Sequence, residues 1–284
     1  MIEENPLFAY QDFQAEHPTT KAIRRVRLYT VSARDKTNHE SVRRAAIQEF
    51  QILESLDHPG ILRALDFNEH ELGPAILFRR ELDEVRLDHF LRLRGAALPF
   101  DIRLSLVRQI ADAVRYAHSH SVIHRTLSPK SILVIHPGSD HPEVRLFNWQ
   151  AGRVLSSNSV SPASRTGTLH PSQYSEESTL CYIARESMLD PHGRDPMADI
   201  FSLGAIAFHI FSGRAPAASA TGLNQLLTGH NGLPLGATLD GATPRLQVLI
   251  LEATAPELLL RTETASDFLA GLDKFEAELT GPAA

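Results

Sequence analysis

The chain has 284 residues, of which 43% are hydrophobic and 22% charged, and its formal net charge is -6. That length allows a large core, in one two-lobed domain or in two small ones. The charge gives no electrostatic reason to expect nucleic acid or an anionic membrane as partner, and one cysteine excludes an internal disulfide or a cysteine-based metal cage. The longest apolar run is too short to span a bilayer, and residues 1–20 lack a signal-peptide pattern, so we expect a cytoplasmic protein.

Residues 1–80 predict a small sheet with one helix. The stretch IRRVRLYTV alternates polar and apolar residues, as half-buried strands do, and apolar residues recur at helical spacing over 40–56. The predicted strands are Phe13–Glu16, Ile23–Val31, Ile61–Phe67 and Ala75–Phe78. Arg25 and Arg27 share one side of the second strand, and one interpretation is that they form a solvated basic face.

Residues 81–284 predict a mainly helical region. The predicted helices are Leu87–Leu93, Asp101–Ser119, a buried helix starting at Asp199, Leu223–Leu227, Leu246–Ala255 and Ala265–Phe275. Two short apolar strands, Ser131–His136 and Glu143–Phe147, are joined by a Pro/Gly/Asp turn. Ala151 to Leu180 is rich in Ser, Thr, Gly and Pro and has no apolar period, which predicts a long loop.

The segment His124-Arg125-Thr126 precedes the first of these strands, and Asn148-Trp149-Gln150 follows the second. This layout resembles the catalytic core of the eukaryotic-type protein kinases, which has HRDxxxxN and DFG at these places. RVRLY similarly resembles the family's VAIK strand, and the other similar segments are EFQILESLDHPGI (the end of the αC helix), YIARE (YxAPE), DIFSLG (DxxSLG) and PELLLR (DPxxR). The resemblance implies an α+β, bilobal protein-kinase-like fold. Its N-lobe would cover 1–80 and its helical C-lobe 81–284, with an activation-like segment over 148–186.

The residues that carry out phosphoryl transfer in that family are replaced here. The resemblance puts Thr126 at the catalytic base, and a hydroxyl cannot take a proton as a carboxylate does. It puts Ser131 and Asn148 at the two magnesium ligands, where they offer only neutral oxygens. Ser128 stands for the catalytic-loop lysine, and Arg27 for the phosphate-binding lysine. We therefore expect no catalytic residue, no metal and no cofactor.

The nucleotide-binding parts of the N-lobe also differ. No glycine precedes Gly60, so the stretch from Asn5 to Tyr10 stands where the family has a Gly-rich loop, with side chains that would obstruct a triphosphate and with Pro6 removing a donor. Arg79-Arg80-Glu81 falls at the interlobe hinge, where adenine needs an apolar wall.

Residues that hold the fold's shape are retained. The resemblance implies a pair between Arg27 and Glu49, with Trp149 in the place of the DFG phenylalanine. It also implies hydrogen bonds from the backbone of the His124-Arg125 segment to Asp199. The last retained pair joins Glu186 to Arg261.

Other polar residues have simpler interpretations. His118 and His120 suggest a metal only if the kinase resemblance is ignored, and His136, Asp140 and His141 lie in a turn that should face solvent. Asp140 and Glu143 are near the site in sequence, but such a turn should not aim them at it. The loop hydroxyls are possible phosphate acceptors, although loops of this kind are rich in Ser and Thr anyway: Ser156, Ser157, Ser159, Ser161, Ser164, Thr166 and Thr168.

These patterns together indicate a pseudokinase that acts as a regulatory or scaffolding module. Its expected partner is a protein, either an active kinase domain or other domains of the same polypeptide. The RRVRLY segment also resembles kinase-like domains of bacterial anti-phage defence proteins. Two alternatives stay open: an enzyme that uses nucleotide at a metal-poor site, and a switch that binds nucleotide without catalysis.

Overall fold

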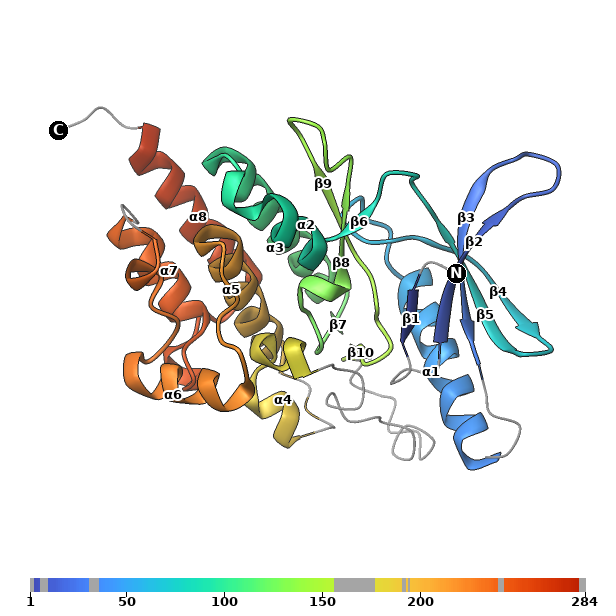
Figure 1. The fold of residues 1–284 in the computed structure, drawn as a ribbon. Coiled ribbons are helices and arrows are strands. Elements are labelled where there is room, and N and C mark those ends of the chain that lie inside the picture. Colours follow the sequence, from blue (N-terminus) through green and yellow to red (C-terminus); the bar gives the residue numbers. More distant parts are fainter. Residues whose placement is uncertain are drawn as a thin grey trace.

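The computed structural model describes residues 3–5, 10–30, 36–155, 177–190, 193, 195–239 and 243–280. Figure 1 shows a sheet with helix α1 on one side of the molecule and a group of helices on the other, with the short strands β8 and β9 between them. None of the helices in these described ranges has the length and hydrophobicity needed to cross a bilayer.

The N-terminal sheet has five strands in the order β1-β2-β3-β5-β4, all paired antiparallel. Their bounds, with that of the helix packed on the sheet, are β1 Glu3–Asn5, β2 Tyr10–Glu16, β3 Ile23–Tyr29, β4 Ala64–His70, β5 Gly73–Arg79 and α1 Lys36–Glu54. The sequence did not predict β1, and β2 begins three residues before the predicted Phe13.

Strand register decides which side chains meet beneath this sheet. Asp12 of β2 is directly opposite Arg27 of β3, and Tyr10 is opposite Tyr29. Because side chains alternate between faces along a strand, Arg25, Arg27 and Tyr29 all lie on the same face. That face is the buried one.

The C-terminal part is built from helices and three short strand pairs. The helices are α2 Leu87–Arg94, α3 Phe100–Ser119, α4 Arg185–Leu189, α5 Met197–Ser212, α6 Ala220–His230, α7 Pro244–Ala253 and α8 Ala265–Thr280. The strands are β6 Val85–Arg86, β7 Val122–Ile123, β8 Ile132–Ile135, β9 Glu143–Leu146 and β10 Arg153–Val154, paired as β6-β8-β9 and β10-β7.

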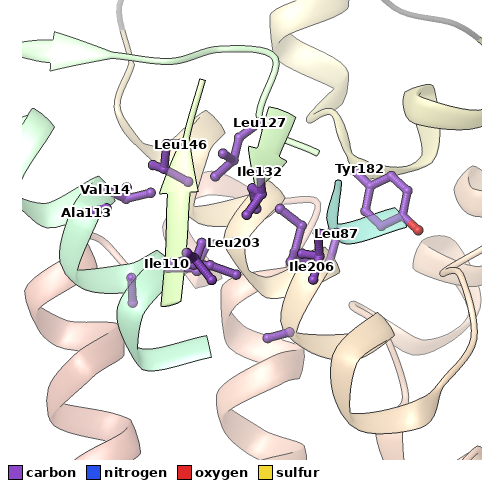
Figure 2. Packing of buried hydrophobic residues seen from close by; sticks show 14 of the residues in the cluster. Leu87, Ile110, Ala113, Val114, Leu127, Ile132, Leu146, Tyr182, Leu203 and Ile206 are labelled. Atoms are coloured by element: carbon purple, nitrogen blue, oxygen red, sulfur yellow. The ribbon is translucent and has the colours of Figure 1, made fainter. Parts of the chain in front are cut away.

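Helix α5 is the centre of the C-terminal core. Every residue from Ala198 to Phe211 except His209 is buried, which fits a helix that is hydrophobic on all sides. Figure 2 shows Leu203 and Ile206 of this helix within the same apolar cluster as Ile110 of α3 and Leu146 of β9. The helix ends at Gly213, whose φ of 71° is the left-handed conformation that glycine adopts without strain.

Helices α5 and α7 approach closely at Gly204. A Cβ at this position would lie 2.7 Å from the Cβ of Ala253 and 2.8 Å from Cγ2 of Thr254. Neither neighbour is the end of a long flexible side chain, so the helices would have to separate.

We predict that Gly204→Ala destabilises the domain by about 1–3 kcal/mol, because overpacking outweighs the better helix propensity of alanine. The matched control is Gly229→Ala in the exposed last turn of α6, where a Cβ meets nothing within 4 Å. That control should be neutral or stabilising by up to about 1 kcal/mol. Urea unfolding of both variants measures the difference; a Gly204 variant as stable as the control would contradict the close approach.

Candidate functional site

Five charged side chains form a buried network under the N-terminal sheet. Arg27 donates from Nε and Nη2 to the two oxygens of Asp12, at 2.9 and 3.0 Å, and from Nη1 to Glu49 at 3.0 Å. Arg25 donates to Asp12 at 2.8 Å and to Glu84 at 2.6 Å. All five side chains are at most 3% exposed. The interpretation of Arg25 and Arg27 as a solvated basic face is therefore wrong.

The charges of the network are balanced. Besides its bond to Arg25, Glu84 lies 3.8 Å from Arg80 Nε, so three cations face three carboxylates. Burial alone would raise the pKa of Asp12, but Arg27 and Arg25 more than offset this and hold it below its ordinary 3.8. Burial would likewise lower the pKa of Arg27, and the charges of Asp12 and Glu49 raise it instead. Asp12, Arg25 and Arg27 are consequently ionised at neutral pH.

Two tyrosines extend the network toward the C-lobe. The hydroxyl of Tyr29 donates to Glu49. The ring of Tyr10 stacks on the guanidinium of Arg27, 3.9 Å from the ring centre, and its hydroxyl donates to Asn148 at 3.3 Å. Both tyrosines are 1% exposed. The space between β2, α1 and the segment after β9 is thus occupied by the chain's own side chains.

The interlobe connection joins the network through Glu84. This residue lies just before β6, and one of its oxygens also accepts the N–H of Glu81 at 3.3 Å. Its bond to Arg25 ties β3 to the segment that leads into the C-lobe. The sequence predicted charge at the hinge from Arg79-Arg80-Glu81, but it did not single out Glu84.

The positions aligned with the kinase catalytic loop offer only neutral groups. Ser128 and Ser131 bond to each other, with the Ser131 hydroxyl accepting the Ser128 N–H and donating to the Ser128 carbonyl, both at 2.9 Å. Thr126 is half-buried. The Asn148 amide donates to the carbonyl of Lys130 at 3.3 Å.

The two nearby acids do not replace the missing carboxylates. The side chain of Glu143 is 55% exposed and pairs with Arg145 at 3.1 Å. Asp140 is exposed in the turn between β8 and β9. Both therefore face solvent at the tip of this hairpin.

Asp199 holds the segment before the catalytic loop. It accepts the backbone N–H groups of His124 and Arg125, each at 2.7 Å, and a third bond joins it to His118 Nε2 at 3.0 Å. Arg125 has a φ of 70°, a conformation unfavourable for a side chain of this size. The two backbone bonds to a buried carboxylate hold that conformation in place. The other histidine at the end of α3, His120, does not share this contact and instead bonds to the carbonyl of Tyr116.

Trp149 lies between the network and this segment. Its side chain is fully buried, its ring centre is 4.5 Å from that of His124, and its backbone N–H donates to Glu49 at 2.9 Å. Burial lowers the pKa of His124, so its ring is neutral at pH 7. Its Nε2 lies 3.0 Å from the Phe147 carbonyl, within hydrogen-bond distance. Glu49 thereby connects α1, β3 and the residues after β9.

A second ion pair joins α4 to the segment before α8. Arg261 donates from Nη1 to Glu186, and also to the carbonyls of Met197 and Ala255 at 3.0 and 2.9 Å. Its guanidinium lies 5.3 Å from the ring centre of Phe201. This buried arginine links three separate parts of the C-lobe.

Some predictions concern residues outside the described ranges. They are the loop residues Pro6 to Ala9 and the seven hydroxyl residues between Ser156 and Thr168. Among the residues that the structure does describe, no group of three or more His, Cys, Asp or Glu could hold a metal ion.

Sequence reasoning missed Asp12, Glu84 and Tyr29 as members of the site. Asp12 lies in YQDFQAE, whose alternation places Tyr10, Asp12 and Gln14 on one face of β2. That pattern would have revealed Asp12 only with the β2–β3 register known, since a shift by one residue turns every side chain to the other face.

Comparisons with known proteins agree with this geometry. Residues 13–271 match the family model of the protein kinase domain. The chain is 30% identical over 305 residues to "Probable kinase PglW" of Streptomyces coelicolor, an alignment that covers 100% of this chain and 19% of that protein. It is 24% identical to serine/threonine-protein kinase PrkC of Bacillus subtilis (84% of this chain, 34% of that protein) and 26% identical to PknJ of Mycobacterium tuberculosis (78% and 36%).

The chain thus spans about a fifth to a little over a third of the length of these relatives. The family match covers both lobes, from β2 into α8. It includes the segments before β8 and after β9 that the sequence singled out. The chain belongs to the protein kinase family.

Proposed function

We propose that this domain is a pseudokinase, a kinase-like fold that acts by binding protein rather than by transferring phosphate. The observation that carries the proposal is the buried network of Asp12, Arg25, Arg27, Glu49 and Glu84. Adenine needs an apolar wall beside the hinge, yet here the sheet presents paired charges to that region. Asp12 and Glu49 already take all three nitrogens of Arg27. A phosphate that used this arginine would have to displace a buried carboxylate, and breaking a buried ion pair is strongly unfavourable.

The missing carboxylates support the same proposal. Phosphoryl transfer depends on positioned charge, with two metal ions and a proton acceptor. Thr126, Ser131 and Asn148 supply neither, and Ser131 is already bonded to Ser128. The retained contacts of Asp199, Glu186 and Arg261 hold shape and need no ligand.

A nucleotide-using enzyme is the second candidate. It is favoured by the names of the relatives, which are all called kinases, and by the Arg27–Glu49 pair at the positions of the family's Lys–Glu pair. A third possibility is a switch that binds nucleotide without metal. Nucleotide binding distinguishes these candidates.

The setting of the domain is also a proposal. We infer a cytoplasmic, bacterial regulatory or scaffolding domain within a longer signalling or phage-defence protein. The supporting observation is that the relatives are longer than this chain and that one of them, PglW, aligns with all of it. Its partner would be an active kinase domain or another domain of the same polypeptide.

We predict that ATP does not stabilise the domain, with or without Mg²⁺ or Mn²⁺. A ligand that binds only the folded state at about 100 times its Kd would add about 2.7 kcal/mol to the unfolding free energy, so a thermal-shift titration to millimolar ATP detects binding. A metal-dependent rise in melting temperature would favour the enzyme, and a metal-independent rise would favour the switch.

We predict that Thr126→Asp combined with Asn148→Asp gives no phosphate transfer. These changes restore two carboxylates, but the paired charges beneath the sheet remain. The measurement is incorporation of labelled phosphate from ATP into the protein and a generic substrate, with the melting temperature confirming that the variant is folded. Transfer by this variant would show that the cleft admits nucleotide despite the network.

We predict that Asp12→Asn lowers the unfolding free energy by about 3–5 kcal/mol at pH 7, because two buried arginines lose a shared carboxylate. The control is Asp83→Asn, whose pair with His136 is half-exposed and should leave stability unchanged. The folded-state pKa of Asp12 is below its ordinary 3.8, so its contribution is present above that value and is lost as pH falls through the folded pKa.

The asparagine variant should therefore lose less stability than the wild type below pH 3.8. Urea unfolding across this range measures both effects. Equal stability of Asp12→Asn and wild type at pH 7 would contradict the structural role given to the network.

A further inference from the structure

Four leucines on two segments of the C-lobe are exposed. Leu258, Leu259 and Leu260 form a short helical turn and are 39%, 97% and 51% exposed, and Leu189 at the end of α4 is 71% exposed. Single exposed leucines are ordinary, but a group of them marks an interaction site in many soluble proteins.

The two segments that carry these leucines are held together. Glu186 of α4 accepts from Arg261, which directly follows Leu260. The two segments also border one cavity of about 190 Å³, whose lining includes Arg125, Glu186, Ser187, Asp190, Asp195 and Leu258. We call this cavity with Leu189 and Leu258–Leu260 the leucine surface.

One of the residues that line this cavity, Arg125, carries a buried donor. Arg125 is 2% exposed and its Nη2 donates to the carbonyl of Asp190 at 3.1 Å, but its Nη1 has no hydrogen-bond partner among the residues that the structure describes. A buried unpaired N–H is unfavourable and is rare in folded proteins. An added anion would lie beside Glu186, Asp190 and Asp195, whereas a neutral main-chain carbonyl would satisfy the donor without such repulsion.

Among the described residues, the exposed charged side chains beside these leucines are mostly acidic. Glu257 and Glu263 flank the leucine turn and are exposed, and Asp190 is exposed next to Leu189. Arg185 is an exposed cation at the start of α4, whereas Arg261 is buried and paired with Glu186. A partner with lysine or arginine beside its apolar side chains complements this rim.

We propose that the leucine surface docks a protein segment that carries leucine-sized side chains flanked by lysine or arginine. A main-chain carbonyl of that segment accepts the N–H from Arg125 Nη1. A second copy of this chain fits less well, since two acidic rims would face each other. The inference deepens the proposed binding role by naming its surface and its partner's chemistry.

The test uses two synthetic amphipathic peptides of equal length, one of leucine and arginine and one of leucine and glutamate. Fluorescence anisotropy measures their binding to the whole chain and to two variants, Leu259→Ser and Leu72→Ser. Leu72 is 61% exposed in the turn between β4 and β5, far along the chain from the leucine surface. Both positions are exposed, so both variants should fold.

The leucine–arginine peptide should bind the wild type and Leu72→Ser equally and bind Leu259→Ser about tenfold more weakly, as for a contact residue. Glu257→Gln should also weaken binding of this peptide relative to the wild type, by a larger factor at low salt, where charge pairs are least screened. Hydrogen exchange of the complex should show protection at 185–190 and 256–261. The leucine–glutamate peptide should not bind.

Three results would overturn the proposal: no binding of the leucine–arginine peptide, equal binding to Leu259→Ser, or a dimer in sedimentation that Leu259→Ser abolishes. The ATP titration is independent of this experiment. A stabilising effect of ATP would contradict the pseudokinase proposal and leave the peptide result unaffected. A failure of the leucine–arginine peptide to bind would contradict the leucine surface and leave the pseudokinase proposal unaffected.

Discussion

The position of Arg27 between two buried carboxylates is the constraint on which the N-lobe depends. Its guanidinium binds Asp12 with two nitrogens and Glu49 with the third, so one planar group fixes β2, β3 and α1 relative to one another. Removing these charges from water is costly, and the cost is offset only because each carboxylate accepts at least two hydrogen bonds. Glu49 adds bonds from Tyr29 and from the backbone of Trp149.

The C-lobe uses the same principle with a different residue. Asp199 sits at the start of the buried helix α5 and accepts two backbone N–H groups from the segment before the catalytic loop. Burial raises the pKa of the Asp199 carboxyl, but its hydrogen bond with the His118 side chain, and after it the contacts with His124, lower that pKa below its ordinary 3.8. Both lobes are therefore held by internal ionic and hydrogen-bonded contacts.

The sequence predicted most of this arrangement where the signal was local. Helix α5 was recognisable from its apolar run, and the segments around His124 and Asn148 from their spacing to two strands. The match to the protein kinase domain establishes the fold those motifs implied. The pairing of Asp12 with Arg27 could not be predicted, because it depends on the register of β2 with β3 and not on either strand alone. Glu84 could not be predicted for a similar reason, since the short connection before β6 has no periodicity that indicates which of its side chains is buried.

The buried network and the absent carboxylates have a common physical consequence in the proposed role. An αC–sheet alignment that depends on bound nucleotide is stabilised in proportion to ligand concentration. Here Asp12 supplies a second anion for Arg27 from within the chain, 2.9 Å from its Nε. In the proposed role, the alignment of α1 with the sheet would then be independent of the nucleotide supply. A pseudokinase held in this way would present the same surfaces whether ATP is abundant or scarce, which suits the proposed binding role. An enzyme, in contrast, must open its cleft to exchange substrate and product.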